Sequence, residues 1–93
     1  MAATYQLFMG RNIPGGDYVT DEGFNKFLHI VDTIVDGYTV YDAQGVWEGE
    51  HEDCKVMTVS CTDEQINQIA RTYKQAFSQL AVGLVQLPSM EFV

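Results

Sequence analysis

The chain has 93 residues, the size of one domain, and 46% of them are hydrophobic, which excludes a disordered chain. Its formal net charge is −8 with only five Lys and Arg residues, which argues against a nucleic-acid partner because phosphate binding needs clustered positive charge. This acidity fits a cationic or zwitterionic small molecule better, although solubility alone also explains an acidic surface.

Several other classes of site find no support in the sequence. No apolar run approaches the roughly 20 residues that cross a membrane, and the N-terminus has no signal pattern, so we expect a cytoplasmic protein without membrane contact. His29 and His51 have no Cys or His partners at ligand spacing, so we expect no metal and no cofactor. Cys54 and Cys61 would lie on opposite faces of one strand, too far apart for a disulfide.

The first half of the chain predicts a strand, a turn and a helix. Residues 4–10 (TYQLFMG) are aromatic and apolar, and a glycine ends the predicted strand. Residues 14–16 (PGG) form a strong turn signal, without the lysine and serine of a phosphate-binding loop. Thr20 can cap a helix that ends at Asp36 and Gly37, with the glycine in the left-handed conformation. The apolar stripe of this helix consists of Phe24, Phe27, Leu28, Val31, Ile34 and Val35.

The second half predicts two strands, a helix and a last strand. Residues 38–50 (YTVYDAQGVWEGE) form a long β segment and residues 54–61 (CKVMTVSC) a second strand, with the acidic residues between joining them. Gly45 and Gly49 suit a bulge or a bend. Thr62 to Gln65 is a capping box, and residues 81–87 are a strand closed by a proline. The stripe of the second helix is Ile66, Ile69, Ala70, Tyr73 and Phe77.

The element order is therefore strand, helix, strand, strand, helix, strand. Right-handed crossovers place both helices on one face of a four-stranded antiparallel sheet, because each crossover returns the chain over the same face. We therefore predict one α+β domain with a ferredoxin-like fold over residues 1–93. A small chain so rich in apolar residues would also bury more surface by self-association.

Residues 45–53 (GVWEGEHED) carry four carboxylates, a histidine and the single tryptophan of the chain. Glu48, Glu50 and Glu52 alternate, so on an extended strand they would point to one side, roughly 7 Å apart. Such carboxylates repel one another unless a cation lies among them, and Trp47 offers a flat face to a cation or a purine. The alternative is a hairpin whose acids are merely solvated, as charged edge strands guard against aggregation.

Two tyrosines on the predicted second strand could approach these acids. Tyr38 and Tyr41 would lie on opposite faces of the strand, so one would pack inward and the other would face outward or toward a partner. Either tyrosine could approach the acids if the strand bends at Gly45.

The succession DGYTVYDAQGVWEGEHED, KVMTVSC and AVGLVQ resembles the small S-adenosylmethionine (SAM) lyases of bacteriophages, formerly called SAM hydrolases. The similarity covers residues 36–86. The chain is also similar to a family of small uncharacterised bacterial proteins that share the features found here at residues 13–16, 36–47 and 73–79.

The resemblance to the lyases implies a ferredoxin-like subunit, a homotrimer similar to the PII signalling proteins, and active sites in clefts between subunits. It implies that the carboxylate of SAM attacks its own γ-carbon, which yields 5′-methylthioadenosine and L-homoserine lactone. If the gene is phage-encoded, the enzyme would work in the host cytoplasm and deplete the methyl donor to blunt restriction.

Carried over to this sequence, the important glutamate of the lyases maps to Glu50 or Glu52, and the important tyrosine to Tyr41. The register across the hairpin leaves the choice between the two glutamates open. The alternative function is a PII-like module that binds a small molecule or nucleotide without catalysis, although few positive charges are present to hold ATP. The residues that we expect to bind substrate are Trp47, Glu48 and Tyr38.

Overall fold

Strand β1 (Ala3–Gly10) lies at the centre of the sheet in a computed structural model that describes residues 2–93. It pairs antiparallel with β5 (Glu50–Cys61) on one side and with β6 (Gly83–Leu87) on the other. Tyr5, Leu7 and Met9 alternate along β1 and are buried under the helices, as the period of two in a strand requires.

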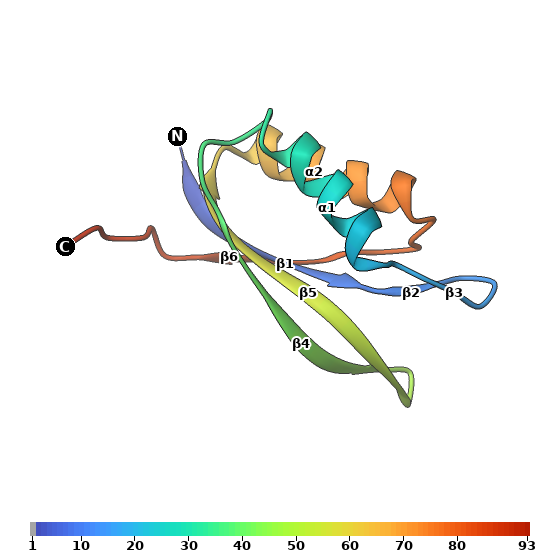
Figure 1. The fold of residues 1–93 in the computed structure, drawn as a ribbon. Helices are drawn as coiled ribbons and strands as arrows, with labels where there is room; N and C mark the ends of the chain where they lie inside the picture. The colour runs from blue at the N-terminus through green and yellow to red at the C-terminus, as the bar shows by residue number, and fades with distance from the viewer. Residues whose placement is uncertain (1) are drawn as a thin grey trace.

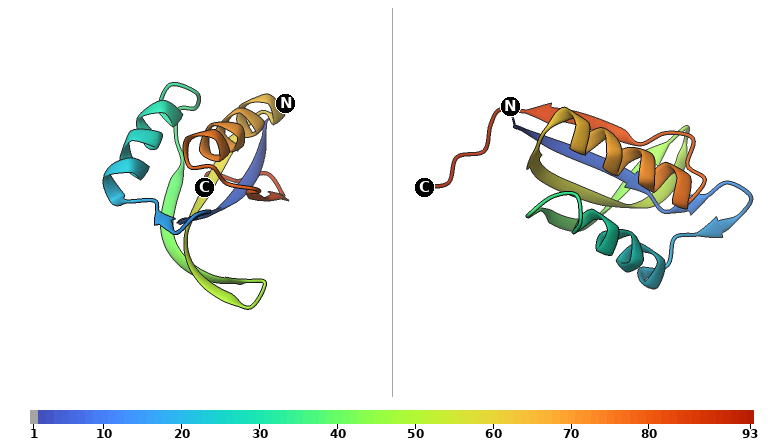
Figure 2. Two further views of the ribbon diagram at one scale, coloured as in Figure 1. Left: turned by 90° about the vertical axis from the view of Figure 1, so that its right-hand side faces the viewer. Right: turned by 90° about the horizontal axis from the view of Figure 1, so that it is seen from above.

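Within residues 2–93 the sheet has four strands in the order β4-β5-β1-β6, with β4 (Thr39–Trp47) at one edge. Helices α1 (Asp21–Val31) and α2 (Asp63–Ala76) both lie on one face of it, as Figures 1 and 2 show. This order is the ferredoxin-like one, and the predicted α+β fold is confirmed. Within residues 2–93, neither helix is long and apolar enough to cross a membrane.

Helix α1 begins as predicted but ends earlier. The Thr20 side chain accepts a hydrogen bond of 3.0 Å from the backbone N–H of Gly23, which makes it the N-cap. The prediction that this helix reaches residues 36–37 is wrong, because the chain turns after Val31. Thr33 donates both its N–H and its hydroxyl to the carbonyl of Ile30, which tightens the last turn. Gly37 does not adopt a left-handed conformation.

The glycine-rich turn joins two short strands that the sequence did not predict, β2 (Asn12–Ile13) and β3 (Asp17–Tyr18). The N–H of Gly16 donates to the carbonyl of Ile13 over 3.1 Å, and Gly15 has a φ of 102°. A proline followed by a glycine with positive φ is typical of a type II turn, so the turn prediction is confirmed. This small hairpin leaves the sheet beside the start of α1 (Figure 1).

The acidic residues between the two middle strands are not a connecting loop, contrary to the prediction. Strand β5 begins at Glu50, and Trp47 pairs directly with Glu50 across a two-residue turn. Glu48 and Gly49 have φ values of 49° and 82°, the left-handed conformations of a type I′ turn, whose twist matches that of the strands. The pairing is continuous through Gly45 and Glu52, so β4 has no bulge there.

Helix α2 lies beside α1 on the same face of the sheet and completes the core. The reciprocal capping box of Thr62 and Gln65 is confirmed, with bonds of 2.9 and 3.2 Å. The predicted last strand is confirmed, although it begins at Gly83 rather than at residue 81. Edge-to-face and tilted aromatic contacts join the two helices through Phe24, Phe27, Tyr73 and Phe77.

The face of the sheet opposite the helices carries apolar side chains that no helix or strand of residues 2–93 covers. Val56 of β5 is buried on this face because it is flanked by its cross-strand neighbours Phe8 and Tyr41. Phe8 and Tyr41 are themselves 41% and 47% exposed, and Val85 of β6 is 41% exposed. We call this surface, made of Phe8, Tyr41, Val56 and Val85, the open face.

Candidate functional site

Four of the residues predicted for the site share one face of the β4–β5 hairpin. The paired positions are Tyr41 with Val56, Gly45 with Glu52, and Trp47 with Glu50. Cross-strand partners project to the same side of a sheet, so Tyr41, Trp47, Glu50 and Glu52 all belong to the side of the open face. The hairpin extends well beyond the helices (Figure 1), and Trp47 is 68% exposed there.

These four residues are spread along the hairpin rather than gathered at one point. Tyr41 is four residues from Gly45 and six from Trp47, which corresponds to about 13 Å and about 20 Å along the strand. The Tyr41 hydroxyl accepts a hydrogen bond of 3.5 Å from the Gln6 amide at the centre of the sheet. Within one chain, Tyr41 is therefore too far from Glu50 for both to contact the same reacting atoms.

Glu52 is held in place, whereas Glu50 is exposed at the tip. A carboxylate oxygen of Glu52, Oε2, accepts a hydrogen bond of 3.1 Å from the backbone N–H of Asn12. Its carboxylate lies against Gly10, where a Cβ would come within 2.6 Å of Oε2. Among the predicted catalytic carboxylates, Glu52 alone therefore has an orientation fixed by the fold.

Glu48 and Tyr38 do not lie with the other predicted site residues. Glu48 is in the turn, where the alternation of the strand is interrupted, so the three alternating glutamates do not share one side. Tyr38 precedes β4, at the end remote from the hairpin tip, and packs against the core. Its hydroxyl donates to Asp32 over 2.6 Å. Burial, and then this hydrogen bond, raise the pKa of Tyr38 to about 12.

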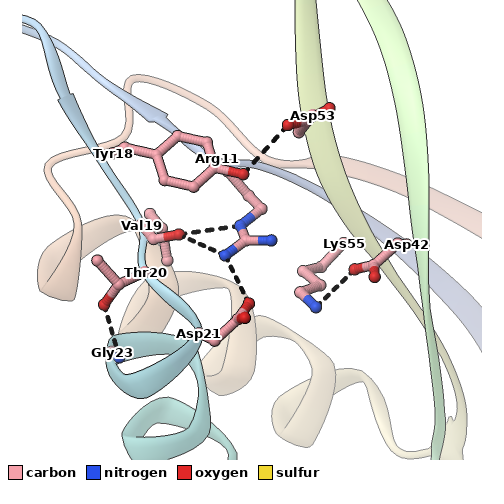
Figure 3. Close-up of polar contacts among 9 residues, drawn as sticks. All are labelled: Arg11, Tyr18, Val19, Thr20, Asp21, Gly23, Asp42, Asp53 and Lys55. Atoms are coloured by element: carbon pink, nitrogen blue, oxygen red, sulfur yellow. Dashed lines mark hydrogen bonds and ion pairs between the residues drawn. The ribbon is translucent and has the colours of Figure 1, made fainter.

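A second polar cluster, which the sequence analysis missed, surrounds Arg11 at the end of β1 (Figure 3). Its Nε and Nη2 donate to the carbonyl of Val19 over 2.9 and 2.7 Å, and Nη2 also donates to Asp21 over 2.9 Å. The guanidinium lies 4.7 Å from the centroid of the Tyr18 ring. The Tyr18 hydroxyl donates to Asp53 over 3.2 Å.

Beside this cluster, Lys55 of β5 forms an ion pair of 2.5 Å with Asp42 of β4. The hydrogen bond from Lys55, together with its charge, lowers the pKa of Asp42. Arg11 and Lys55 are two of the five cations of the chain, and their place in the sequence gave no signal that they would lie near one another.

Two adjoining pockets open along the hairpin. The larger has a volume of about 490 Å³ and is lined by Arg11, Asp42, Ala43, Gln44, Asp53 and Cys54. The smaller, of about 190 Å³, is lined by Asn12, Gln44, His51, Glu52 and Asp53. Both share Gln44 and Asp53, so Glu52 and Arg11 line neighbouring spaces.

Neither cysteine forms a disulfide. Cys54 and Cys61 are free, and burial followed by the charges of Glu52, Asp53 and Asp42 raises the pKa of Cys54. Within residues 2–93, no group of three or more His, Cys, Asp and Glu side chains is placed to hold a metal ion.

Residues 4–92 match the family described as "Protein of unknown function (DUF3574)". The chain belongs to this family. Comparison with curated protein sequences gives no significant match. The DUF3574 match extends over both helices and all the strands of the sheet, so it covers every residue of the candidate site.

Several solved structures share the fold of this DUF3574 chain. The divalent cation tolerance protein CutA1 from Thermus thermophilus is 13% identical, with a TM-score of 0.61 over 100% of this chain and 88% of that one. CutA from Archaeoglobus fulgidus is 12% identical, with a TM-score of 0.63 over 100% and 88%. A phage SAM lyase in its apo state is 13% identical, with a TM-score of 0.63 over 97% and 91%. At these identities the likeness shows the fold alone.

Proposed function

We propose that this chain is a SAM lyase that acts as a homotrimer, with active sites between subunits. The observation that carries the proposal is the placement of Trp47 opposite Glu50 and of Gly45 opposite Glu52 on one face of the hairpin. A flat aromatic ring and two carboxylates then line one surface, and the glycine leaves open space beside the ordered carboxylate. A sulfonium compound with an ammonium group suits such a surface.

The reaction needs no proton transfer and no cofactor. An oxygen of the substrate carboxylate attacks the γ-carbon, the bond from the γ-carbon to sulfur breaks, and its electron pair stays on sulfur. The sulfonium thereby becomes the neutral thioether of 5′-methylthioadenosine, and the remainder closes to L-homoserine lactone with its ammonium intact. The enzyme contributes mainly by folding the methionine chain so that carboxylate and γ-carbon meet in line, which can supply several kcal/mol.

Each side chain has a role that follows from its position. Glu52, fixed by the Asn12 N–H, grips the ammonium and so holds the substrate curled. Trp47 packs the adenine, and its exposure leaves a ring face free for stacking. The Tyr41 hydroxyl orients the substrate carboxylate without neutralising it. Glu50 adds negative potential that attracts the sulfonium toward the cleft.

Self-association brings Tyr41 to the glutamates. The open face carries Phe8, Tyr41 and Val85 partly exposed around the buried Val56, and a second copy covering it would remove these apolar side chains from water. Tyr41 lies about 13 Å along β4 from Gly45, the residue that pairs with Glu52. Tyr41 and Glu52 therefore contact one substrate only when they come from different subunits.

The proposal is tested by incubating the purified protein with SAM and separating the products by chromatography. A lyase produces 5′-methylthioadenosine and homoserine lactone in equal amounts. If SAM binds but is recovered unchanged at micromolar enzyme, the protein is a binding module and not a lyase. If SAM neither binds nor reacts, the hairpin is not a sulfonium site.

A further inference from the structure

Arg11 has one guanidinium nitrogen that the fold does not use. Its side chain is only 10% exposed, and its hydrogen bonds to Val19 and Asp21 occupy Nε and Nη2. Nη1 has no protein acceptor among the residues that the structure describes. In Figure 3 this third nitrogen points toward β5, between Asp53 and Lys55. Arg11 and Asp53 both line the 490 Å³ pocket. A buried cation whose free donors face a cavity is poised for a ligand that carries an acceptor.

The other groups around the pocket restrict what that ligand can be. Asp42 is paired with Lys55 and Asp21 with Arg11, so the two cations are already balanced by two carboxylates. Asp53 is exposed and adds a further negative charge; its Oδ2 accepts from Tyr18, and its other oxygen has no donor in the described chain. A plain anion would meet net repulsion here, whereas a zwitterion meets an opposite charge at each end.

We propose that this pocket binds an α-amino acid with an uncharged side chain. Its carboxylate accepts from Arg11 Nη1, and its ammonium contacts Asp53. Ala43 and Cys54 also line the pocket, and neither of these residues adds a charge that would select a charged side chain on the ligand. Nε and Nη2 of Arg11 are held by the Val19 carbonyl and by Asp21 of α1, so the free nitrogen is oriented before the ligand arrives, which lowers the entropy cost of binding.

This inference does not rest on the proposed lyase activity, because the ligand needs neither a sulfonium nor an adenosine. The probes are three compounds with the same thioether chain: L-methionine, 3-(methylthio)propylamine, which lacks the carboxylate, and 4-(methylthio)butanoate, which lacks the ammonium. None of them can undergo the lyase reaction. Binding is followed by NMR titration of the amide signals and of the Arg11 Nε–H signal.

The wild-type protein should bind L-methionine about tenfold or more tightly than either single-charge compound, since each loses a charge-assisted hydrogen bond. The shifts should centre on residues 11, 42–44 and 53–54, with a shift of Arg11 Nε–H. Equal binding of all three compounds, shifts elsewhere, or no shift at about 50 mM methionine would overturn the proposal.

Variants separate ligand binding from a purely structural clamp. Arg11→Gln should bind methionine no better than the amine, whereas Arg71→Gln, which removes an exposed arginine from α2, should keep the wild-type preference. If Arg11→Gln does not fold, Asp53→Asn, which changes an exposed residue, is used instead. This variant should bind methionine no better than 4-(methylthio)butanoate. If Arg11→Gln or Asp53→Asn retains the full preference, or Arg71→Gln loses it equally, the pocket is not an amino-acid site and Arg11 is a structural clamp only.

Discussion

The carboxylate of Glu52 occupies the space beside Gly10 that a side chain would fill. A Cβ at Gly10 would lie 2.6 Å from Oε2 and 2.7 Å from Oε1 of Glu52. The end of β1 is anchored from the other side, because the Tyr73 hydroxyl of α2 donates to the Gly10 carbonyl over 2.7 Å. The position of the glutamate is therefore fixed by the missing side chain at Gly10 and by the helix behind it.

Replacing Gly10 with alanine should displace Glu52 while leaving the fold intact. The clash is with the far end of a flexible side chain, so we expect a stability loss below about 1 kcal/mol in urea unfolding. Methylthioadenosine production should fall about tenfold or more because Glu52 leaves its place beside the Asn12 N–H. Gly37→Ala, remote from the hairpin and with nothing within 4 Å of an added Cβ, is the matched control. Equal activity in the two variants would show that the position of Glu52 does not matter.

The two candidate glutamates should respond differently to neutralisation. Glu52→Gln removes the negative charge that we propose contacts the substrate ammonium. Loss of such a charge-assisted contact should lower kcat/KM about ten- to a hundredfold. Glu50→Gln, at the exposed tip, should cost less than about tenfold because it changes only the surrounding potential. Steady-state kinetics on both variants measures this difference. A larger loss for Glu50→Gln would reverse the assignment.

A charge on the open face should abolish self-association. In Val85→Glu the new carboxylate would be buried between subunits without a partner, so the assembly should dissociate at micromolar concentration. Leu80→Glu changes an 88% exposed leucine in the α2–β6 connection and should leave the assembly unchanged. Sedimentation equilibrium gives the mass of each variant. A wild-type protein that sediments as a monomer, or a Val85→Glu trimer, would exclude this face as the interface.

Tyr38 should make stability fall at high pH. Its pKa is about 12 in the folded chain against about 10 in an unfolded one, so between these values the folded state keeps a proton that the unfolded state has lost. The stabilising contribution is complete below about pH 10 and is lost as the pH rises toward 12. The difference in the free energy of unfolding between wild type and Tyr38→Phe should therefore shrink over this range. A difference that stays constant would mean that burial and the hydrogen bond to Asp32 do not raise the pKa of Tyr38.

The order of the elements could be predicted because the signals that determine it are local. The caps at Thr20 and Thr62 satisfy backbone donors three residues away, and the buried stripes follow the helical period. The hairpin turn was missed because Glu48 is an unusual residue for a left-handed position, which Asn or Asp more often takes in a type I′ turn. The end of α1 depends on the Thr33 hydroxyl, which can bond to the backbone in either a helix or a turn.

The candidate site could be predicted only where it follows from strand alternation. Glu50 and Glu52 share a face because they are two residues apart on one strand. The hydrogen bond between Glu52 and Asn12 joins residues 40 positions apart, and the cluster around Arg11, which follows β1, includes residues of β3, α1 and β5. Such contacts depend on how the elements pack, so they cannot be predicted from composition or from spacing along the chain.

The most direct test of the account is to co-express Tyr41→Phe and Glu52→Gln in one cell and to measure methylthioadenosine production by the mixed assemblies. Each variant alone should be nearly inactive. If each cleft takes Tyr41 from one subunit and Glu52 from another, random mixing restores both wild-type residues in about a quarter of the clefts, and about a quarter of wild-type activity returns. Activity that stays at the level of the single variants, in assemblies shown to contain both chains, would contradict an active site shared between subunits.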